Sequence, residues 1–370
     1  MKRGWCPTLH EPMQSGDGWL ARVKPRLGRL GAGDARALAA AARRYGNGVI
    51  ELTSRANLQF RGLSLSGVGE FAELVVGLGL AEVDPARERR RHVLACPLGD
   101  TQPAAALEAS LMADDTMAAL PGKFTVVVDC GGTPSMRGVT ADISVRIVGD
   151  RAWITLDGER RGVGCAPHAV VEVTHRLIHA MLARGHTRMR EAPGAKLLAT
   201  IGPMADPPVP APRGPAIGPL PGGAFGIGLA FGATDADGLV ELADLAGEQT
   251  LRLTVWRSVI FPHAPGRAPG KVGMFVDPED DLVSVSACAG LPGCAQAFLE
   301  TRDTARRLAG RMRGRSLHVS GCAKGCAHPG PSDVTLVGTA DGIDLVWQGR
   351  AGDAPAGRGM DVGAVAAMLS

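Results

Sequence analysis

The sequence predicts an α+β protein built from two related halves. Three observations support this prediction: strand patterns alternate with helical patterns, one strand–helix–strand plan occurs twice, and a proline-rich stretch separates the two copies. Hydrophobic residues make up 45% of the chain and charged residues 21%, as is usual for a folded protein. A length of 370 residues suggests two or three compact units.

The first copy of the plan lies near the N-terminus. Residues 19–23 alternate as a strand does, and Asp34 is placed to cap an alanine-rich helix that runs to Gly46. Residues 49–53 then form a second strand pattern. This order predicts a strand, a helix and a strand in succession.

The second copy follows about two hundred residues later. It predicts a strand over 225–229, a helix over 239–246 and a strand over 251–257. The stretch Ile-Glu-Leu-Thr at 50–53 aligns with Leu-Arg-Leu-Thr at 251–254, and an arginine follows each threonine closely. Two such halves would form a pseudo-twofold molecule with a site between them.

Between and after the two copies, further elements are predicted. The segment 203–221 contains repeated Pro-Pro, Pro-Ala-Pro and Gly-Pro steps without apolar periodicity, which indicates a linker. The remaining strand patterns cover 124–128, 142–146, 152–156, 334–337 and 343–346, and a helical pattern covers 166–183.

Composition limits the classes of function. A net charge of +3 is too small to indicate nonspecific nucleic-acid binding. We find no apolar run of about 18 residues and no signal-peptide pattern at the N-terminus, so we expect no membrane segment and a cytoplasmic location. In a reducing compartment, clustered cysteines indicate a metal site or catalysis and not a disulfide framework.

Four of the eight cysteines form two close pairs near the C-terminus. Cys288 and Cys294 are separated by five residues, and Cys322 and Cys326 by three. Glycines beside them allow a backbone to approach closely and to offer N–H groups to sulfur. We therefore predict a 4Fe-4S cluster. Zinc is the main alternative, but the wider pair exceeds the common zinc spacing, and unrelated buried thiols are a second alternative.

The other cysteines show no metal-binding spacing. They are Cys6, Cys96, Cys130 and Cys165. Their isolation favours buried or half-buried thiols that pack as small apolar groups.

With this cysteine spacing, the chain resembles the sulfite and nitrite reductase superfamily. Three further motifs carry the resemblance: Thr-x-Arg-x-x-x-Gln over 53–59, Arg-His-Val over 91–93, and Leu-Pro-Gly-Lys-Phe over 120–124. The resemblance covers nearly the whole chain. It implies two ferredoxin-like half-domains in pseudo-twofold arrangement plus α+β domains that bind a 4Fe-4S cluster and a tetrapyrrole, with siroheme as the tetrapyrrole of the reductases.

The chain departs from the reductases in two of these motifs. Thr125 stands where sulfite-reducing members carry a second lysine, and His92 stands where they carry asparagine. The opening segment over 3–23, the Asp-Cys-Gly-Gly run at 129–132 and especially the Ser-Gly-Cys-Ala-Lys-Gly-Cys-Ala-His-Pro-Gly loop over 320–330 are similar to the precorrin-3B synthases, which belong to the same superfamily.

The resemblance also implies domain limits. We expect a first ferredoxin-like half, a first tetrapyrrole-binding α+β domain, a linker, a second ferredoxin-like half and a second α+β domain that carries the cysteines. Their expected limits are 1–80, 81–202, 203–221, 222–280 and 281–370, respectively.

For function, the resemblance implies hydroxylation of precorrin-3A at C20 by dioxygen with closure of a γ-lactone. NADH would be the indirect electron source, through a separate donor protein of flavin reductase or ferredoxin type. A precorrin is edged with carboxylates, and guanidinium groups bind carboxylates in a bidentate fashion. The residues expected to bind the substrate are Arg55, Asn57, Gln59, Arg61, Arg91 and Lys123, of which Arg91 and Lys123 are also expected to be catalytic.

A mononuclear non-haem iron is a further implied cofactor, and its ligands stay open. His175 and His179 have the i, i+4 spacing of a metal grip, although one face of an amphipathic helix explains them equally well. His328 follows a cluster cysteine and His92 lies in a family motif, so each is another candidate.

Three functions compete at this point: the precorrin monooxygenase, a siroheme-dependent sulfite or nitrite reductase, and a noncatalytic electron carrier. A Gly-x-Gly pattern at 67–69 superficially matches a dinucleotide-binding fingerprint, but no complete βαβ unit surrounds it. We interpret it as a turn followed by a helix.

Overall fold

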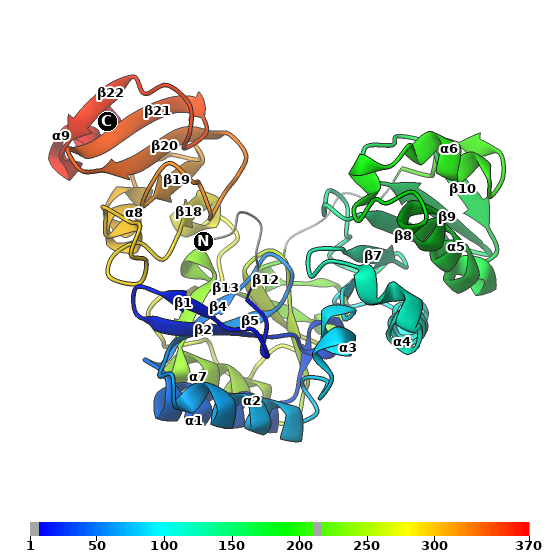
Figure 1. The fold of residues 1–370 in the computed structure, drawn as a ribbon. Helices are drawn as coiled ribbons and strands as arrows, with labels where there is room; N and C mark the ends of the chain where they lie inside the picture. Colours follow the sequence, from blue (N-terminus) through cyan, green and yellow to red (C-terminus); the bar gives the residue numbers. More distant parts are fainter. Residues whose placement is uncertain (1–6, 210–215, 370) are drawn as a thin grey trace.

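The computed structural model describes residues 7–209 and 216–369, arranged as a base with two lobes (Figure 1). The base carries α1, α2 and α7 below its strands, one lobe carries α5 and α6, and the other carries β20, β21 and β22. Within the described residues, no helix is long and apolar enough to cross a membrane. The mixed architecture confirms the predicted α+β class.

A five-stranded sheet and a six-stranded sheet form the base. The first has the order β1 (Met13–Ser15), β2 (Gly18–Val23), β5 (Leu58–Leu63), β4 (Val49–Leu52) and β14 (Ala233–Asp235). The second has the order β12 (Gly218–Pro219), β13 (Phe225–Leu229), β16 (Ser258–Phe261), β15 (Leu251–Leu253) and β3 (Arg29–Leu30), and β17 (Met274–Phe275) also pairs with β13. The helices of the base are α1 (Ala32–Tyr45), α2 (Gly67–Gly77) and α7 (Ala236–Ala246).

The two halves of the base exchange one strand each. β14, from the second half, pairs antiparallel with β4, and β3, from the first half, pairs antiparallel with β15. Because each half completes the other's sheet, neither half is a self-contained layer. One core, with large side chains such as Phe60, Phe71 and Phe261, runs through both.

The turns before the exchanged strands show the same backbone twice. Leu27 and Phe231 have φ values of 49° and 61°, and Gly28 and Gly232, which follow them, have 69° and 71°. A Cβ at either glycine would lie 2.7 Å from a carbonyl oxygen of the opposite half. This repetition confirms the duplication that the sequence predicted.

The lobe with α5 contains the third sheet. Its order is β11 (Met204–Ala205), β10 (Gly162–Cys165), β9 (Arg151–Leu156), β8 (Ile143–Val148), β7 (Val126–Asp129) and β6 (Val93–Ala95). Its helices are α3 (Pro85–Arg89), α4 (Gln102–Ala113), α5 (Val170–Leu182) and α6 (Gly194–Ala199). The apolar faces of the sheet and helices form a separate core.

The other lobe contains the fourth sheet. Its order is β18 (Val285–Ala287), β19 (Leu317–Ser320), β20 (Ser332–Thr339), β21 (Gly342–Gly349) and β22 (Gly357–Met360), with α8 (Thr301–Ala309) and α9 (Val362–Leu369). In both lobes, three parallel strands are followed by antiparallel ones. The lobes are therefore also related to each other, a second duplication that sequence reasoning missed.

Several predicted elements have different limits in the structure. The helix expected to be capped by Asp34 begins at Ala32, with Gly31 as its N-cap. The helix expected from Leu239 begins at Ala236, because the Asp235 side chain caps it. The strand expected over 251–257 ends at Leu253.

A threonine turn ends that strand early. Thr254 Oγ1 accepts hydrogen bonds from the backbone N–H groups of Trp256 and Ser258, which bends the chain. The predicted helix over 166–183 is shorter as well, since residues 167–169 form a 3₁₀ turn before α5. The predicted turn and helix start at 67–69 agrees with α2.

Candidate functional site

The four predicted cluster cysteines come together at one edge of the fourth sheet. β18 and β19 are parallel neighbours, so the loops at their carboxyl ends leave from the same edge. Cys288 follows β18 directly, and the backbone N–H of Gly321, after β19, donates to its Sγ at 3.2 Å. The second cysteine loop also carries Cys326, whose pKa is raised by burial and then by the thiols of Cys322, Cys288 and Cys294.

Glycines let these loops approach closely. Gly290 has a φ of +62°, and a Cβ there would lie 2.5 Å from Thr301 Oγ1. A Cβ at Gly321 would lie 2.7 Å from the Cβ of Ala297. A larger residue at Gly321 would push the second cysteine loop away from Ala297, and one at Gly290 would collide with the start of α8.

The spacing of the sulfurs argues against a single zinc ion. Four thiolates around zinc at about 2.3 Å would lie about 3.8 Å from one another. All four cysteines are among the described residues, yet no three of their sulfurs lie within 4.8 Å of one another. The group of ligand atoms that meets this limit is elsewhere, at Asp114, His175 and His179. As they stand, no three of the four cysteine sulfurs are gathered as closely as one zinc ion would need.

Arg61 fastens the first cysteine loop to the base. Its guanidinium donates to Asp17 at 2.9 Å and to Glu51 at 3.4 Å, and it also donates to the carbonyl oxygen of Gly293. Ser15 Oγ donates to the same carbonyl at 2.7 Å. The structure thus places Arg61, an expected substrate-binding residue, in a buried clamp under the cysteines.

The neighbouring Gln59 is held in the same polar row of the sheet. Its Oε1 accepts from Arg22 at 3.0 Å, and its Nε2 donates to Glu51 at 2.6 Å. Asn57 lies two residues earlier, in the turn directly before β5, where its backbone N–H donates to Thr53 Oγ1 at 3.2 Å. The four steps from Asn57 to Arg61 span about 13 Å at the rise of a strand. The polar residues from Arg61 to Asn57 therefore connect the cysteine loop with a pocket that Asn57 lines.

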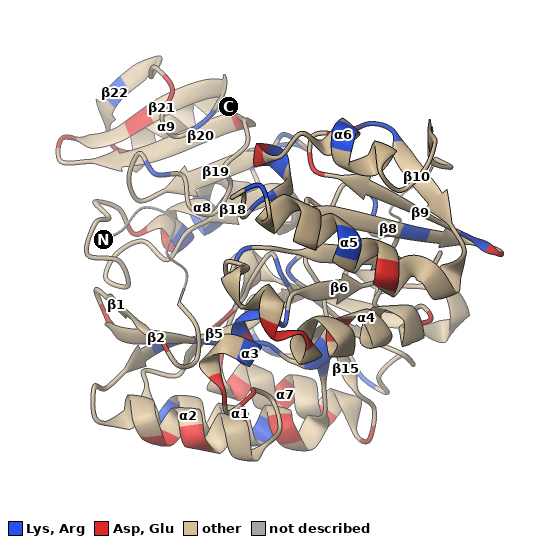
Figure 2. Ribbon diagram, turned by 45° about the vertical axis from the view of Figure 1, so that its right-hand side comes forward, with Lys and Arg blue, Asp and Glu red and all other residues tan. Residues whose placement is uncertain are grey.

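That pocket is small, with a volume of about 20 Å³, which is the room that one or two water-sized molecules need. Three of the expected substrate-binding residues line it: Arg55, Asn57 and Arg91. The complete lining is Lys24, Pro25, Leu27, Gly28, Arg55, Asn57, Arg91, His92, Val93, Leu94, Glu108 and Thr125. Basic segments lie beside β5 and α3, while acidic segments mark α2 and α7 (Figure 2).

Arg55 joins the base to the lobe that carries β7. Its Nε donates to Thr125 Oγ1 at 3.2 Å and its Nη2 to the carbonyl oxygen of Lys123 at 3.4 Å. Thr125 is itself anchored, because its backbone N–H donates to Asp142, whose side chain is fully buried. Thr125 therefore acts as a neutral support for Arg55.

Arg91 is largely occupied by backbone groups. Its guanidinium donates to the carbonyl oxygens of Leu80 and Lys24, both at 2.9 Å, and to Glu88 at 3.1 Å. Lys24 in turn donates to the carbonyl oxygen of Glu88 at 3.0 Å. These bonds hold the Arg91 side chain in one position in the lining of the pocket. Its buried Nε atom has no partner among the described groups.

Sequence reasoning missed Lys24. Its side chain is 5% exposed and lines the pocket beside Arg55. The available signal was its rarity, since lysine occurs six times in the whole chain, at positions 2, 24, 123, 196, 271 and 324. Because most basic residues of this chain are arginines, each of its few lysines is a candidate for a specific role.

His92 presents an unprotonated nitrogen in this cationic pocket. Burial and then the charges of Lys24, Arg55 and Arg22 hold the pKa of His92 well below its usual value, against a hydrogen bond to the backbone at Arg89. Its Nε2 is buried and has no partner among the described groups. His92 can therefore accept a hydrogen bond from a bound molecule at neutral pH.

The other expected site residues lie outside the pocket. The Lys123 side chain does not line it, although the Lys123 carbonyl oxygen holds Arg55. His175 and His179 lie on α5, and His328 lies in the second cysteine loop, where its ring is 5.9 Å from that of His318.

Two of the isolated cysteines have environments that suit packing thiols. Cys96 is buried, donates to Asp129 at 3.2 Å, and has its pKa raised to about 12, chiefly by burial. Burial also raises the pKa of Cys130 to about 11. Cys165 is half-buried, and Cys6 lies outside the described residues.

Comparison with known proteins gives three findings. The nitrite/sulfite reductase ferredoxin-like half domain matches residues 11–76. A ferredoxin–nitrite reductase from Synechococcus elongatus is 24% identical, over 94% of this chain and 83% of that protein. The solved structure of the Mycobacterium tuberculosis NirA protein matches with a TM-score of 0.69 at 18% identity, over 89% of this chain and 73% of that one, which shows the fold.

A more similar relative is a precorrin-3B synthase from a Sinorhizobium species. It is 35% identical, over 96% of this chain and 85% of that protein. Similarity of this extent includes both halves of the base, both lobes and the cysteine loops. The chain therefore belongs to the precorrin-3B synthase family, built on the fold of the nitrite and sulfite reductases.

Proposed function

We propose that this protein hydroxylates precorrin-3A at C20 with dioxygen and closes an acetate side chain into a γ-lactone, in aerobic cobalamin biosynthesis. The observation that carries the proposal is the similarity along nearly the whole chain to a precorrin-3B synthase. One oxygen atom enters the substrate and the other leaves as water, which consumes two electrons and two protons. NADH supplies these electrons through a separate donor protein of flavin reductase or ferredoxin type.

The size of the pocket indicates how the substrate lies. A volume of about 20 Å³ admits dioxygen but not a macrocycle. The flat precorrin therefore lies over the polar row of β5, between the pocket and the cysteine loop, with its carboxylates toward basic side chains. Arg55 and Lys123 are the proposed carboxylate contacts, because guanidinium and ammonium groups bind carboxylates strongly.

The pocket residues have separate roles in this proposal. Lys24 and Arg55 stabilise the negative charge that develops as dioxygen is reduced, because fixed cations in a water-poor site need no reorganisation. His92 accepts a hydrogen bond at Nε2. Arg91, whose guanidinium is held by backbone carbonyls, acts as a positioning residue that fixes Lys24.

Cys288, Cys294, Cys322 and Cys326 are the proposed ligands of a 4Fe-4S cluster, which supplies electrons one at a time when bound. The close approach of the two loops supports this assignment, as does the lack of a zinc-sized group of sulfurs among the described residues. The clamp through Arg61 keeps these loops against the base, beside the proposed substrate position.

The pocket does not fit a mononuclear iron. Its metal-binding side chains are His92 and Glu108, and Glu108 is paired with Arg26 at 2.9 Å. Within the described chain these residues do not form a three-ligand group. We therefore derive no step through an iron ion in the pocket.

A single-turnover experiment tests the proposal. Cluster-loaded protein, prepared without oxygen, receives precorrin-3A, a chemical reductant and then heavy-isotope dioxygen. We expect one heavy oxygen atom in the product, and we expect Arg55→Ala to weaken precorrin binding by about tenfold or more, the loss of one charged hydrogen-bonding group. Unlabelled product, or no product after oxygen is added, would contradict the proposal.

A siroheme-dependent sulfite or nitrite reductase is the second candidate. It is favoured by the 24% identity to a nitrite reductase over 94% of the chain. Thr125 opposes it, because the pocket then lacks one cation for an anionic substrate. A siroheme absorption spectrum together with viologen-driven reduction of sulfite or nitrite would favour this alternative.

A further inference from the structure

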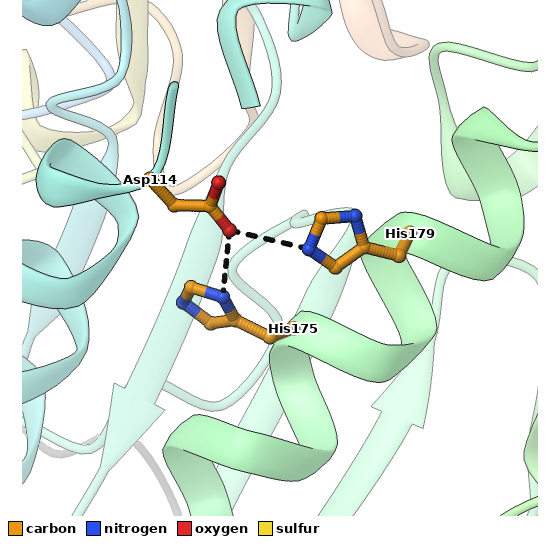
Figure 3. A group of neighbouring side chains, drawn as sticks. All are labelled: Asp114, His175 and His179. Atoms are coloured by element: carbon orange, nitrogen blue, oxygen red, sulfur yellow. Dashed lines mark hydrogen bonds and ion pairs between the residues drawn. The ribbon is translucent and has the colours of Figure 1, made fainter. Parts of the chain in front are cut away.

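Three ligand-type side chains meet where α4 ends against α5, far from the cysteines in the sequence (Figure 3). Asp114 follows α4, and His175 and His179 lie one turn apart on α5. Asp114 Oδ2 is 3.2 Å from His175 Nδ1 and 3.2 Å from His179 Nε2. The three ligand atoms all lie within 4.8 Å of one another.

These distances suit ligands of a single small ion. Nitrogen and oxygen atoms bound at about 2.0–2.1 Å in tetrahedral or octahedral geometry lie about 3.0–3.4 Å apart. Two imidazoles and one carboxylate are preferred by ions such as Fe²⁺ and Zn²⁺, whereas Mg²⁺ and Ca²⁺ prefer oxygen ligands alone. Both the spacing and the chemistry therefore match a divalent transition-metal ion.

The oxygens of Asp114 have separate tasks. Oδ1 caps the 3₁₀ turn over 115–119 by accepting the backbone N–H of Thr116 at 2.9 Å. This bond fixes the carboxylate so that Oδ2 faces both histidines. The aspartate thus keeps its orientation without a metal, and ion binding needs little rearrangement.

His175 also has an outer hydrogen bond of the kind that metal ligands use. Its Nε2 lies 3.1 Å from Ser110 Oγ. When Nε2 donates its proton to Ser110, Nδ1 carries the lone pair toward the centre of the group. The His175 and Asp114 side chains are 17% and 23% exposed and that of His179 is 45% exposed, so an ion and its remaining water ligands have access.

We propose that Asp114, His175 and His179 bind one divalent transition-metal ion of the Fe²⁺ or Zn²⁺ type. The site is separate from the pocket: Glu108 lines the pocket and Ser110 supports His175, and residues two apart on a helix point to different sides. It is separate from the cysteine loops too, which belong to the other lobe (Figure 1).

The ion would tie α5 to a turn that reaches the pocket through the backbone. Arg90 donates to the carbonyl oxygen of Asp114 at 2.6 Å and pairs with Asp115 at 3.0 Å. The next two residues, Arg91 and His92, line the pocket. Occupancy of the metal site therefore steadies the segment that positions these two side chains.

The test is a calorimetric titration of Zn²⁺ into the cluster-loaded protein under anaerobic conditions, with total zinc counted by mass spectrometry after gel filtration. We expect one retained zinc per chain in the wild type and at least tenfold weaker binding in His179→Asn. Ser110→Ala should weaken binding by about tenfold, the usual effect of removing an outer hydrogen bond. His168→Asn is the matched control, an exposed histidine just before α5 that should leave binding unchanged.

Two results would overturn the proposal. One is equal zinc retention by the wild type and by the His175→Asn, His179→Asn double variant. The other is a loss of zinc binding in His168→Asn as large as the loss in His179→Asn. Folding is checked by thermal unfolding, in which Zn²⁺ should raise the melting temperature of the wild type but not of the double variant. A variant that melts normally without zinc yet gains nothing from it supports the site directly.

Discussion

Replacement of Arg61 by methionine tests whether this residue clamps the cysteine loop. The clamp links three partners that are distant in sequence: Asp17, Glu51 and the carbonyl oxygen of Gly293. Methionine keeps an unbranched side chain but removes every one of these bonds. The variant therefore separates the charge and hydrogen bonding of Arg61 from its bulk.

The expected loss of stability follows from burial. The Arg61 side chain is 6% exposed, and those of Asp17 and Glu51 are 13% and 14% exposed. Removing one partner of a buried ion pair costs about 3–5 kcal/mol, because the other charge stays buried and unpaired. Burial raises the pKa of Glu51, but Arg302 and Arg61 outweigh it and lower that pKa overall, so Arg302 still neutralises part of the charge. We therefore expect a loss of about 3 kcal/mol.

The assay is urea unfolding of the cluster-loaded protein, followed by backbone circular dichroism and by cluster absorbance. In Arg61→Met, both transitions should shift to lower urea, and the cluster signal should be lost first. Arg36→Met is the control, since its pair with Asp244 is about half exposed and should contribute less than about 1 kcal/mol. Unchanged unfolding together with weaker precorrin binding would refute the clamp and restore Arg61 as a substrate ligand.

Three further predictions concern the duplicated fold and the cluster. Gly232→Ala should lower stability by about 2 kcal/mol in chemical unfolding, because φ is +71° and the new Cβ would meet the Leu52 carbonyl oxygen, whereas Gly33→Ala meets no atom within 4 Å. His318 is buried and its pKa is lowered to about 4, so the unfolded chain takes up a proton first as pH falls below about 6.5. The free energy of unfolding should therefore decrease by about 2 kcal/mol from pH 7 to pH 5. His318→Val should show a weaker dependence on pH, and an equal dependence in the wild type and the variant would contradict this role of His318. Cys326→Ser should abolish the brown chromophore measured by absorbance, and a full cluster in that variant would disprove its assignment as a ligand.

The duplication of the base was visible in the sequence because it is recorded in local patterns. Strand alternation, helix periodicity and the repeated motif ending in Thr53 and Thr254 each depend on neighbouring residues. The structure adds that both threonines make the same turn, with Oγ1 accepting two backbone N–H groups. The strand exchange had no local signal, since the pairing of β3 with β15 depends on the packing of distant segments.

The duplication of the lobes was hidden for a different reason. β6 and β18 hold the same place in their parallel strands, so Val93 corresponds to Val285 and, three residues later, Cys96 corresponds to Cys288. Short buried strands tolerate many apolar residues, so the two copies share topology with little sequence identity. Cys96 donates to Asp129, while Cys288 accepts the backbone N–H of Gly321 from the second cysteine loop.

The sequence by itself determined the α+β class, the repeated base and the four paired cysteines, because spacing and periodicity are properties of nearby residues. Only the tertiary structure decided which side chains share a site. The sequence places Asn57, Gln59 and Arg61 at alternate positions, but packing sends Asn57, before β5, to the pocket and Arg61, on β5, to the cysteine loop. Likewise, the histidines of α5 acquire a metal-binding partner when the chain brings Asp114 to them across more than 60 residues, a contact that no local pattern encodes.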